Sequence, residues 1–153
     1  MKKIILLLFV LCTVLSIYGQ SSDSLLNVLE SEEVETNRID VLHQLLLDIW
    51  LNYPEQAMAY GEEALEISRL QNDSFNISTS LRLIAGVHYY KGDYDQSLDF
   101  NLRALEIALL IPDSSLINNG YNNIGLLYYD LGSYQTALEY LLKSLAMKKK
   151  IKQ

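Results

Sequence analysis

Few residues in this sequence have the types and spacing that catalysis or metal binding needs. The two histidines, His43 and His88, stand alone in separate regions, and no His-x-x-x-His or Glu-x-x-His pair is present to hold a metal ion. Two acidic clusters, 62–66 and 93–99, contain the closely spaced carboxylates that general acid–base catalysis uses. Their spacing also suits the solvated face of a helix, and we prefer that interpretation.

The remaining signals for chemistry are weaker. The only cysteine is Cys12, and the sequence contains neither a Gly-rich phosphate loop nor a nucleophile elbow. We therefore interpret both histidines as structural or surface imidazoles. The sequence predicts a protein that is not an enzyme and that holds no metal or cofactor.

Composition limits the possible classes of protein. The chain has 153 residues, of which 50% are hydrophobic and 20% charged, a mixture that suits one folded domain or one array of small repeats. The formal net charge is −7, and five of the eight lysines lie within residues 143–152. Because DNA and RNA backbones repel such a surface, we expect no nucleic-acid partner.

Residues 1–19 have the pattern of a secretory signal peptide. Lys2 and Lys3 precede an apolar run over 4–11, and a polar segment follows at 21–24. We predict cleavage after Gly19, and the alternative is an uncleaved membrane anchor. The protein is then exported to the periplasm or faces it. Membrane contact would come only from this segment or from a helix downstream of the present sequence.

The rest of the chain repeats itself with a period of 40 residues. Gly92 and Tyr94 align with Gly132 and Tyr134 when the sequence is shifted by 40, and Ala104 aligns with Ser144. Within each unit the apolar residues recur at steps of three and four, as an amphipathic helix requires. The repeat therefore predicts pairs of helices rather than strands.

Residues that start and stop helices lie where this repeat needs them. Pro54 suits the first turn of a helix, and Asp93 followed by Gln96 resembles a capping box. Ser74 and Ser114 are N-cap candidates. The glycines at 92 and 132 suit the left-handed residue that ends a helix.

The resulting layout begins with a short helix and linker in 20–35. Three helical hairpins follow, at 36–72, 75–112 and 115–151, and their helices are predicted over 36–51, 54–70, 75–91, 94–110, 115–131 and 134–150. The connections are short, so successive helices must pack antiparallel.

The third unit, Tyr121-x-x-Ile124-Gly125-x-x-Tyr128-x-x-x-Gly132-x-Tyr134-x-x-Ala137, resembles the tetratricopeptide repeat. The resemblance implies an all-α, right-handed superhelical array of about three repeats, an α-solenoid. It implies that Gly125 or Ala85 on a first helix faces Ala137 or Ser97 on the second. It also implies that the tyrosines Tyr128, Tyr134 and Tyr140 fill the space between hairpins. The long period is similar to that of kinesin light chains and of bacterial sensor and regulator proteins.

The N-terminal part carries a second resemblance. Ser24-Leu25-Leu26-x-x-Leu29, then Arg38-x-x-Val41-Leu42-x-x-Leu45, then the segment 53–57 resemble the exported sensor regions of Bacteroidetes-type histidine kinases and regulators. Such regions precede a membrane helix and an output domain. Because the sequence ends within the last hairpin, without a polar closing helix, we expect a fragment or a truncated product.

In tetratricopeptide arrays the first helices of the hairpins line a concave groove that takes a protein or peptide. The resemblance therefore implies that partner-binding residues lie on the three first helices. The candidates are Asn119, Asn122, Asn123, Leu126, Tyr129, Arg82, Tyr89 and Tyr90. Leu42, Leu46, Ile49, Thr79 and Gly86 take similar positions, whereas Trp50 is predicted to be a core residue. The Lys/Asn set with which chaperone-binding members of the family clamp a terminal carboxylate is not present.

The sequence is compatible with three functions. The first is an exported, non-catalytic module that binds a protein or peptide and serves as the sensing part of a signal-transduction protein. The alternative is a free-standing scaffold on which other exported proteins assemble. The third, an enzyme, has least support, because neither acidic cluster has a partner residue for catalysis.

Overall fold

The computed structural model describes residues 38–151, together with the side chains up to residue 149. The described residues form six α-helices, and no strand occurs among them. The helices are α2 (Arg38–Ile49), α3 (Pro54–Leu70), α4 (Ser74–Lys91), α5 (Tyr94–Ala108), α6 (Ser114–Asp130) and α7 (Tyr134–Ile151). The observed bounds differ from the predicted ones by at most two residues, and the predicted all-α class is confirmed. The predicted signal peptide, leading helix and linker lie outside the described residues.

The chain divides into two compact units, residues 1–41 and 42–153. Of the first unit the structure describes only residues 38–41, the first turn of α2. The second unit contains the remainder of α2 and all the other described helices. Every contact discussed below lies within this second unit.

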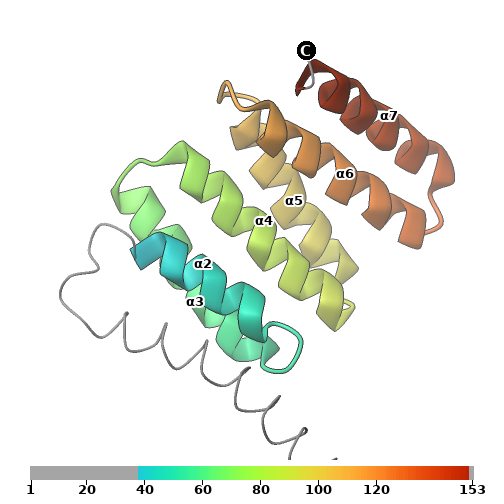
Figure 1. Ribbon diagram of the computed structural model, residues 1–153. Coiled ribbons are helices and arrows are strands. Elements are labelled where there is room, and N and C mark those ends of the chain that lie inside the picture. The colour runs from blue at the N-terminus through green and yellow to red at the C-terminus, as the bar shows by residue number, and fades with distance from the viewer. Residues whose placement is uncertain (1–37, 152–153) are drawn as a thin grey trace, which may run out of the picture. The chain divides into compact units, whose positions relative to one another are not determined.

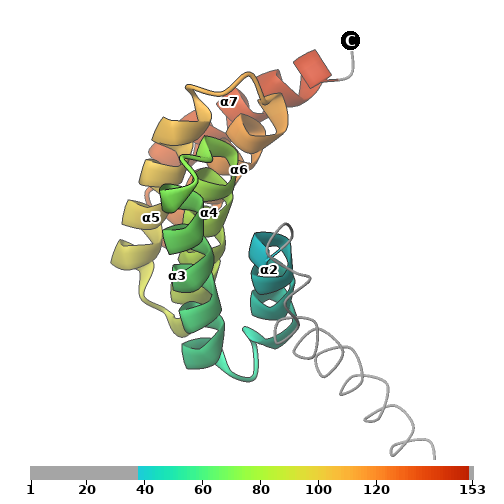
Figure 2. The same ribbon diagram turned by 90° about the vertical axis from the view of Figure 1, so that its left-hand side faces the viewer.

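From α3 onward, helices that follow one another in the sequence pack against one another. α3 contacts α4, α4 contacts α5, α5 contacts α6 and α6 contacts α7 (Figure 1). α4 also contacts α6 directly, although α5 separates them in the sequence. In the turned view of Figure 2, α5 lies to the left of α4 and α6. The first helices of the second and third hairpins are therefore direct neighbours.

Two buried clusters share α4. In the first, Leu46 of α2 and Ala57 of α3 pack with two buried residues of α4. In the second, Leu65 of α3 and Ala104 of α5 pack with Leu81 and Ile84 of α4. Helix α4 thus buries apolar residues against elements on either side of it, which is how repeat proteins build a continuous core from small units.

Aspartates, not serines, cap the helices that begin after positions 73 and 113. The carboxylate of Asp73 accepts a 3.0 Å hydrogen bond from the Asn76 backbone N–H, and Asp113 accepts from the N–H groups of Ser115 and Leu116. The prediction that Ser74 and Ser114 are N-caps is therefore wrong. An aspartate one residue earlier reaches the free N–H groups of the first turn, so the serines become the first helical residues.

Other local predictions have mixed outcomes. Pro54 begins α3, and Gly92 and Gly132 have positive φ angles of 82° and 75°, as predicted. Asp93 precedes α5, but its side chain makes no capping hydrogen bond, so the predicted capping box does not form.

Two expectations about packing inside the third hairpin need correction. A Cβ added to Gly125 would lie 2.8 Å from Cγ of Leu141, so the nearest neighbour of this glycine is Leu141 rather than Ala137. Tyr128 and Tyr140 do stack, with ring centroids 5.7 Å apart, but Tyr134 is 65% exposed and does not fill the space between hairpins. Position 134 is the first residue of α7, where its ring packs against Tyr129 near the surface.

Among the described helices, none combines the length and the hydropathy that crossing a bilayer requires.

Candidate functional site: a pocket between three first helices

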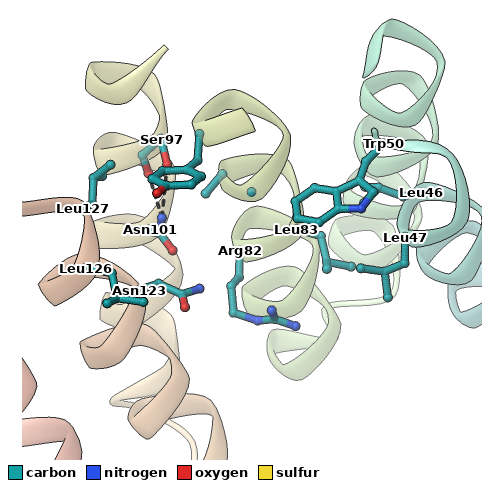
Figure 3. A pocket seen from close by; sticks show the side chains of 13 residues that line it. Leu46, Leu47, Trp50, Arg82, Leu83, Ser97, Asn101, Asn123, Leu126 and Leu127 are labelled. Atoms are coloured by element: carbon teal, nitrogen blue, oxygen red, sulfur yellow. Dashed lines mark hydrogen bonds between the residues drawn. The ribbon is translucent and has the colours of Figure 1, made fainter. Parts of the chain in front are cut away.

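A pocket with a volume of about 310 Å³ lies between the first helices of the three hairpins. Figure 3 shows the side chains that line it. They come from α2 and the residue that follows it, from α4 and from α6, with two residues of α5 as the floor. The lining residues are Leu46, Leu47, Trp50, Arg82, Leu83, Ala85, Gly86, Tyr89, Ser97, Asn101, Asn123, Leu126 and Leu127.

The pocket has an apolar wall on each side. Leu47 and Trp50 stand on one side, whereas Leu126 and Leu127 stand on the other (Figure 3). Trp50 also packs against the buried cluster that contains Leu46, and its ring centroid lies 6.2 Å from that of Tyr90. The sequence predicts Trp50 as a core residue, and the structure places it both at the edge of the core and in the pocket wall.

Gly86 makes room for the indole of Trp50. A Cβ at this position would lie 3.3 Å from Cζ3 of Trp50, closer than ordinary van der Waals contact. The residues 40 positions before and after Gly86 are Leu46 and Leu126. The glycine therefore leaves space for the indole at a position where both neighbouring repeats have a leucine.

The floor of the pocket is polar and almost completely buried. Asn101 is 4% exposed, and its Nδ2 donates a 3.0 Å hydrogen bond to the backbone carbonyl of Ser97. The other atom of the amide, Oδ1, is buried and has no hydrogen-bond partner. Such an unpaired buried acceptor is costly, so its presence at a pocket floor indicates a place for a ligand donor.

Arg82 is the cation of the pocket. Its Nε is buried without a hydrogen-bond partner, and burial lowers the pKa of the guanidinium from its ordinary value. No Asp or Glu is found among the residues that line the pocket. Figure 3 shows Arg82 and Asn123 extending into the same space between the two apolar walls. The pocket therefore contains a positive charge without a neighbouring carboxylate.

Tyr89 borders the pocket at the C-terminal part of α4. Its hydroxyl donates a 2.6 Å hydrogen bond to Oδ2 of Asp130 at the end of α6. This hydrogen bond raises the pKa of Tyr89, because tyrosinate could not donate to the carboxylate. The bond joins two first helices at one edge of the pocket.

The structure brings together four of the eight predicted partner-binding residues. Arg82, Tyr89, Asn123 and Leu126 line the pocket, whereas Asn119, Asn122, Tyr129 and Tyr90 do not. Tyr129 is 58% exposed and packs edge-on against Tyr134. Sequence reasoning missed Leu47, Leu83, Ala85, Ser97, Asn101 and Leu127. For Asn101 a signal existed, because the same column of the repeat holds Gly61 and Leu141, and a buried asparagine is unusual there.

Both histidines have structural partners, as predicted. Nε2 of His43 lies 2.7 Å from the hydroxyl of Ser80, and the ring of His88 stacks on Phe100. Of the acidic residues, Asp99 pairs with Arg103 at the surface. In the part of the chain that the structure describes, no group of three or more His, Cys, Asp or Glu residues could hold a metal ion.

Together these features define an all-α protein of stacked antiparallel hairpins whose first helices share a pocket. The hairpins of α4 to α7 also match a known family. Residues 76–150 match the family described as tetratricopeptide repeat, and the stacked hairpins form a tetratricopeptide-like helical array, a fold typical of protein-interaction modules.

Solved structures agree with this assignment at the level of the fold. The chain is similar to BtubC (BKLC) from P. vanneervenii, with a TM-score of 0.77 and 16% identity over 90% of this chain and 59% of that chain. It is also similar to the apo form of RapI, with a TM-score of 0.70 and 23% identity over 90% of this chain and 38% of that chain. The chain thus spans less than two thirds of either protein. None of the curated proteins matches the sequence.

Proposed function

We propose that this chain is a non-catalytic module that binds a segment of another protein, or a peptide, in the pocket between α2, α4 and α6. We propose that this pocket is part of the concave groove that the sequence predicts on the first helices. We further propose that the module is exported and forms the sensing part of a signal-transduction protein.

One observation carries the binding proposal, namely the pocket of about 310 Å³, whose lining combines Arg82 and Asn101, each with an unpaired polar atom, with apolar side chains on both sides. Ligand sites combine a mostly apolar lining with a few polar groups in this manner. The pocket is lined from three separate hairpins, so a ligand there contacts the whole array rather than one repeat.

Export is supported by the charged and apolar pattern of residues 1–19. Expression of the full chain in a bacterium, followed by fractionation and mass spectrometry of the N-terminus, tests this point. We expect a periplasmic product that begins at Gln20. A cytoplasmic product with an intact Met1 would contradict export.

The single tryptophan provides a direct assay for binding. Trp50 is the only tryptophan of the chain and stands in the pocket wall, so its fluorescence reports on the occupant of the pocket. We suggest selecting peptides from a random display library on the purified full chain and titrating the selected peptides against Trp50 emission. Saturable shifts in emission are expected.

A matched pair of variants tests whether the selected peptides bind in the pocket. Leu126→Ala removes a side chain from the pocket wall, whereas Leu110→Ala removes an equally apolar side chain that is 84% exposed and outside the pocket. The first variant should weaken the selected peptides and the second should not. Equal affinities for both variants, or a library without any binder, would refute the proposed function.

Two observations test the sensing role: which domains the same reading frame encodes, and whether the activity of such a domain responds to a peptide. A membrane helix and a histidine kinase in the same frame, whose activity changes when a selected peptide is added, would support it. A stop codon after residue 153 would favour the alternative of a free-standing scaffold.

A further inference from the structure

The geometry points to a specific ligand for this pocket: an extended peptide with an acidic residue, Asp or Glu, flanked on both sides by apolar residues. This inference rests on the proposed function and narrows it to one class of peptide. The carboxylate pairs with Arg82, a backbone N–H of the peptide donates to Asn101, and the apolar neighbours contact the two walls.

We infer a carboxylate in the ligand because Arg82 lacks a partner for its Nε. Arg82 is half-buried, and a guanidinium that loses part of its hydration gains from pairing with an anion. Nε of Arg82 has no partner, and the residues that line the pocket include no acid that could serve as one. Arg103, which pairs with Asp99 at 3.1 Å, shows how a surface arginine of this chain is satisfied without a ligand.

We infer an N–H donor in the ligand because Oδ1 of Asn101 lacks a partner. Its amide group is oriented by the hydrogen bond from Nδ2 to the Ser97 carbonyl, which leaves Oδ1 as an acceptor. A peptide offers such a donor at each residue except proline. A ligand with a carboxylate and a nearby amide N–H therefore satisfies both unpaired groups at once.

The two apolar walls place the acidic residue inside the peptide rather than at its end. Arg82 and Asn123 stand between Leu47 and Trp50 on one side and Leu126 and Leu127 on the other (Figure 3). An apolar–acidic–apolar sequence matches this order of surfaces, whereas a terminal carboxylate would leave one wall without a contact.

The overall negative charge does not exclude an acidic ligand. The formal net charge of −7 repels it at long range, but salt at 0.1 M screens such repulsion beyond about 10 Å. A charge-assisted hydrogen bond at the half-buried Arg82 acts at contact distance, where screening is small.

The test uses two hexapeptide libraries and the full chain. Both libraries are N-acetylated; one is C-terminally amidated, and the other has a free terminal carboxylate. We expect binders from the amidated library to contain Asp or Glu between two apolar residues. Exchange of that residue for Asn or Gln should weaken binding at least about tenfold, as measured by Trp50 fluorescence.

Two arginine variants locate the contact. Arg82→Gln should abolish the preference for the acidic peptide over its amide analogue, and Arg82→Lys should retain part of it. Arg103→Gln makes the same change of charge outside the pocket and should leave the preference intact. If Arg82→Gln does not fold, the affinities of the acidic peptide and its Asn or Gln analogue for the wild-type protein still test the inference.

The outcomes separate this inference from the proposed function. Binders without any acidic preference, or binders only in the library with a free terminal carboxylate, would overturn the inference and leave peptide binding in place. If neither library yields a binder, both the inference and the proposed function fail.

Discussion

The hydroxyl of Tyr89 donates a 2.6 Å hydrogen bond to the carboxylate of Asp130, which lies 41 residues later in the sequence. The bond joins the C-terminal parts of α4 and α6, the two first helices that contact each other directly. Since Tyr89 also lines the pocket, this pair fixes one border of the candidate site.

Tyr89→Phe tests this link and its pH dependence. Tyr89 is 43% exposed, so the loss of its hydrogen bond should lower the free energy of unfolding by less than about 1 kcal/mol. The bond to Asp130 raises the pKa of Tyr89 above its ordinary value of 10.0. A raised pKa means that the folded protein retains the proton longer than the unfolded chain does. The difference between wild type and variant should therefore be constant below about pH 10 and vanish as the pH rises through the raised pKa.

Urea unfolding at neutral and alkaline pH measures this difference, and absorbance titration of tyrosinate measures the pKa. The variant should lose a tyrosine that titrates above its ordinary range. Asp130→Asn is the control, because it retains an acceptor but removes the charge. The pairing is contradicted if the tyrosine lost in Tyr89→Phe titrates in the ordinary range and Asp130→Asn leaves the titration curve unaltered.

The cap at Asp113 should matter for stability, and the aspartate at 93 should not. Asp113 accepts hydrogen bonds of 2.8 and 2.9 Å from two backbone N–H groups at the start of α6, whereas Asp93 caps no N–H of α5. Asp113→Ala should cost about 1 kcal/mol, and Asp93→Ala only a few tenths. Thermal unfolding of both variants gives the comparison, and equal losses would argue against the capping role.

Gly125 is expected to tolerate no side chain. A Cβ there would lie 2.8 Å from Cγ of Leu141 and 3.2 Å from its backbone N, so α6 and α7 would have to separate. We expect Gly125→Ala to lower the free energy of unfolding by about 1–3 kcal/mol through overpacking. Gly86→Ala is the control, since its Cβ meets only the Trp50 ring, at 3.3 Å. An unchanged melting temperature for Gly125→Ala would contradict the close pairing of the two helices.

Arg82→Met should stabilise the protein while it damages the pocket. Methionine retains the apolar stem and removes a half-buried charge whose Nε has no hydrogen-bond partner, so the free energy of unfolding should rise by up to about 1 kcal/mol. Chemical denaturation without peptide measures this change. A clear loss of stability would mean that Arg82 serves the fold and that its charge is satisfied within the protein.

Much of the fold is readable from the sequence because its determinants are local. The steps of three and four between apolar residues define helices, and Pro54, Gly92 and Gly132 mark where helices begin or end. A period of 40 residues then fixes the order of the hairpins. The errors are also local: Asp73 and Asp113 take the capping positions that the sequence predicts for the serines after them.

Half of the predicted partner-binding residues line the pocket. The other half lie outside it for a geometrical reason. Every first helix exposes several residues, and repeat position alone does not tell which of them meet across hairpins. Asn123 and Leu126 face the space beside α4, whereas Asn119, one turn before Asn123, does not reach the pocket. That choice depends on how α4 and α6 pack.

The helices, their pairing and the repeated columns follow from the sequence without any coordinates, since they depend on residues close together in the chain or related by the repeat. The unpaired buried atoms of Arg82 and Asn101 in one pocket become visible only once the hairpins are packed. Whether a buried polar atom finds a hydrogen-bond partner depends on which atoms of the three hairpins approach one another. The spacing of residues along the chain does not determine those distances.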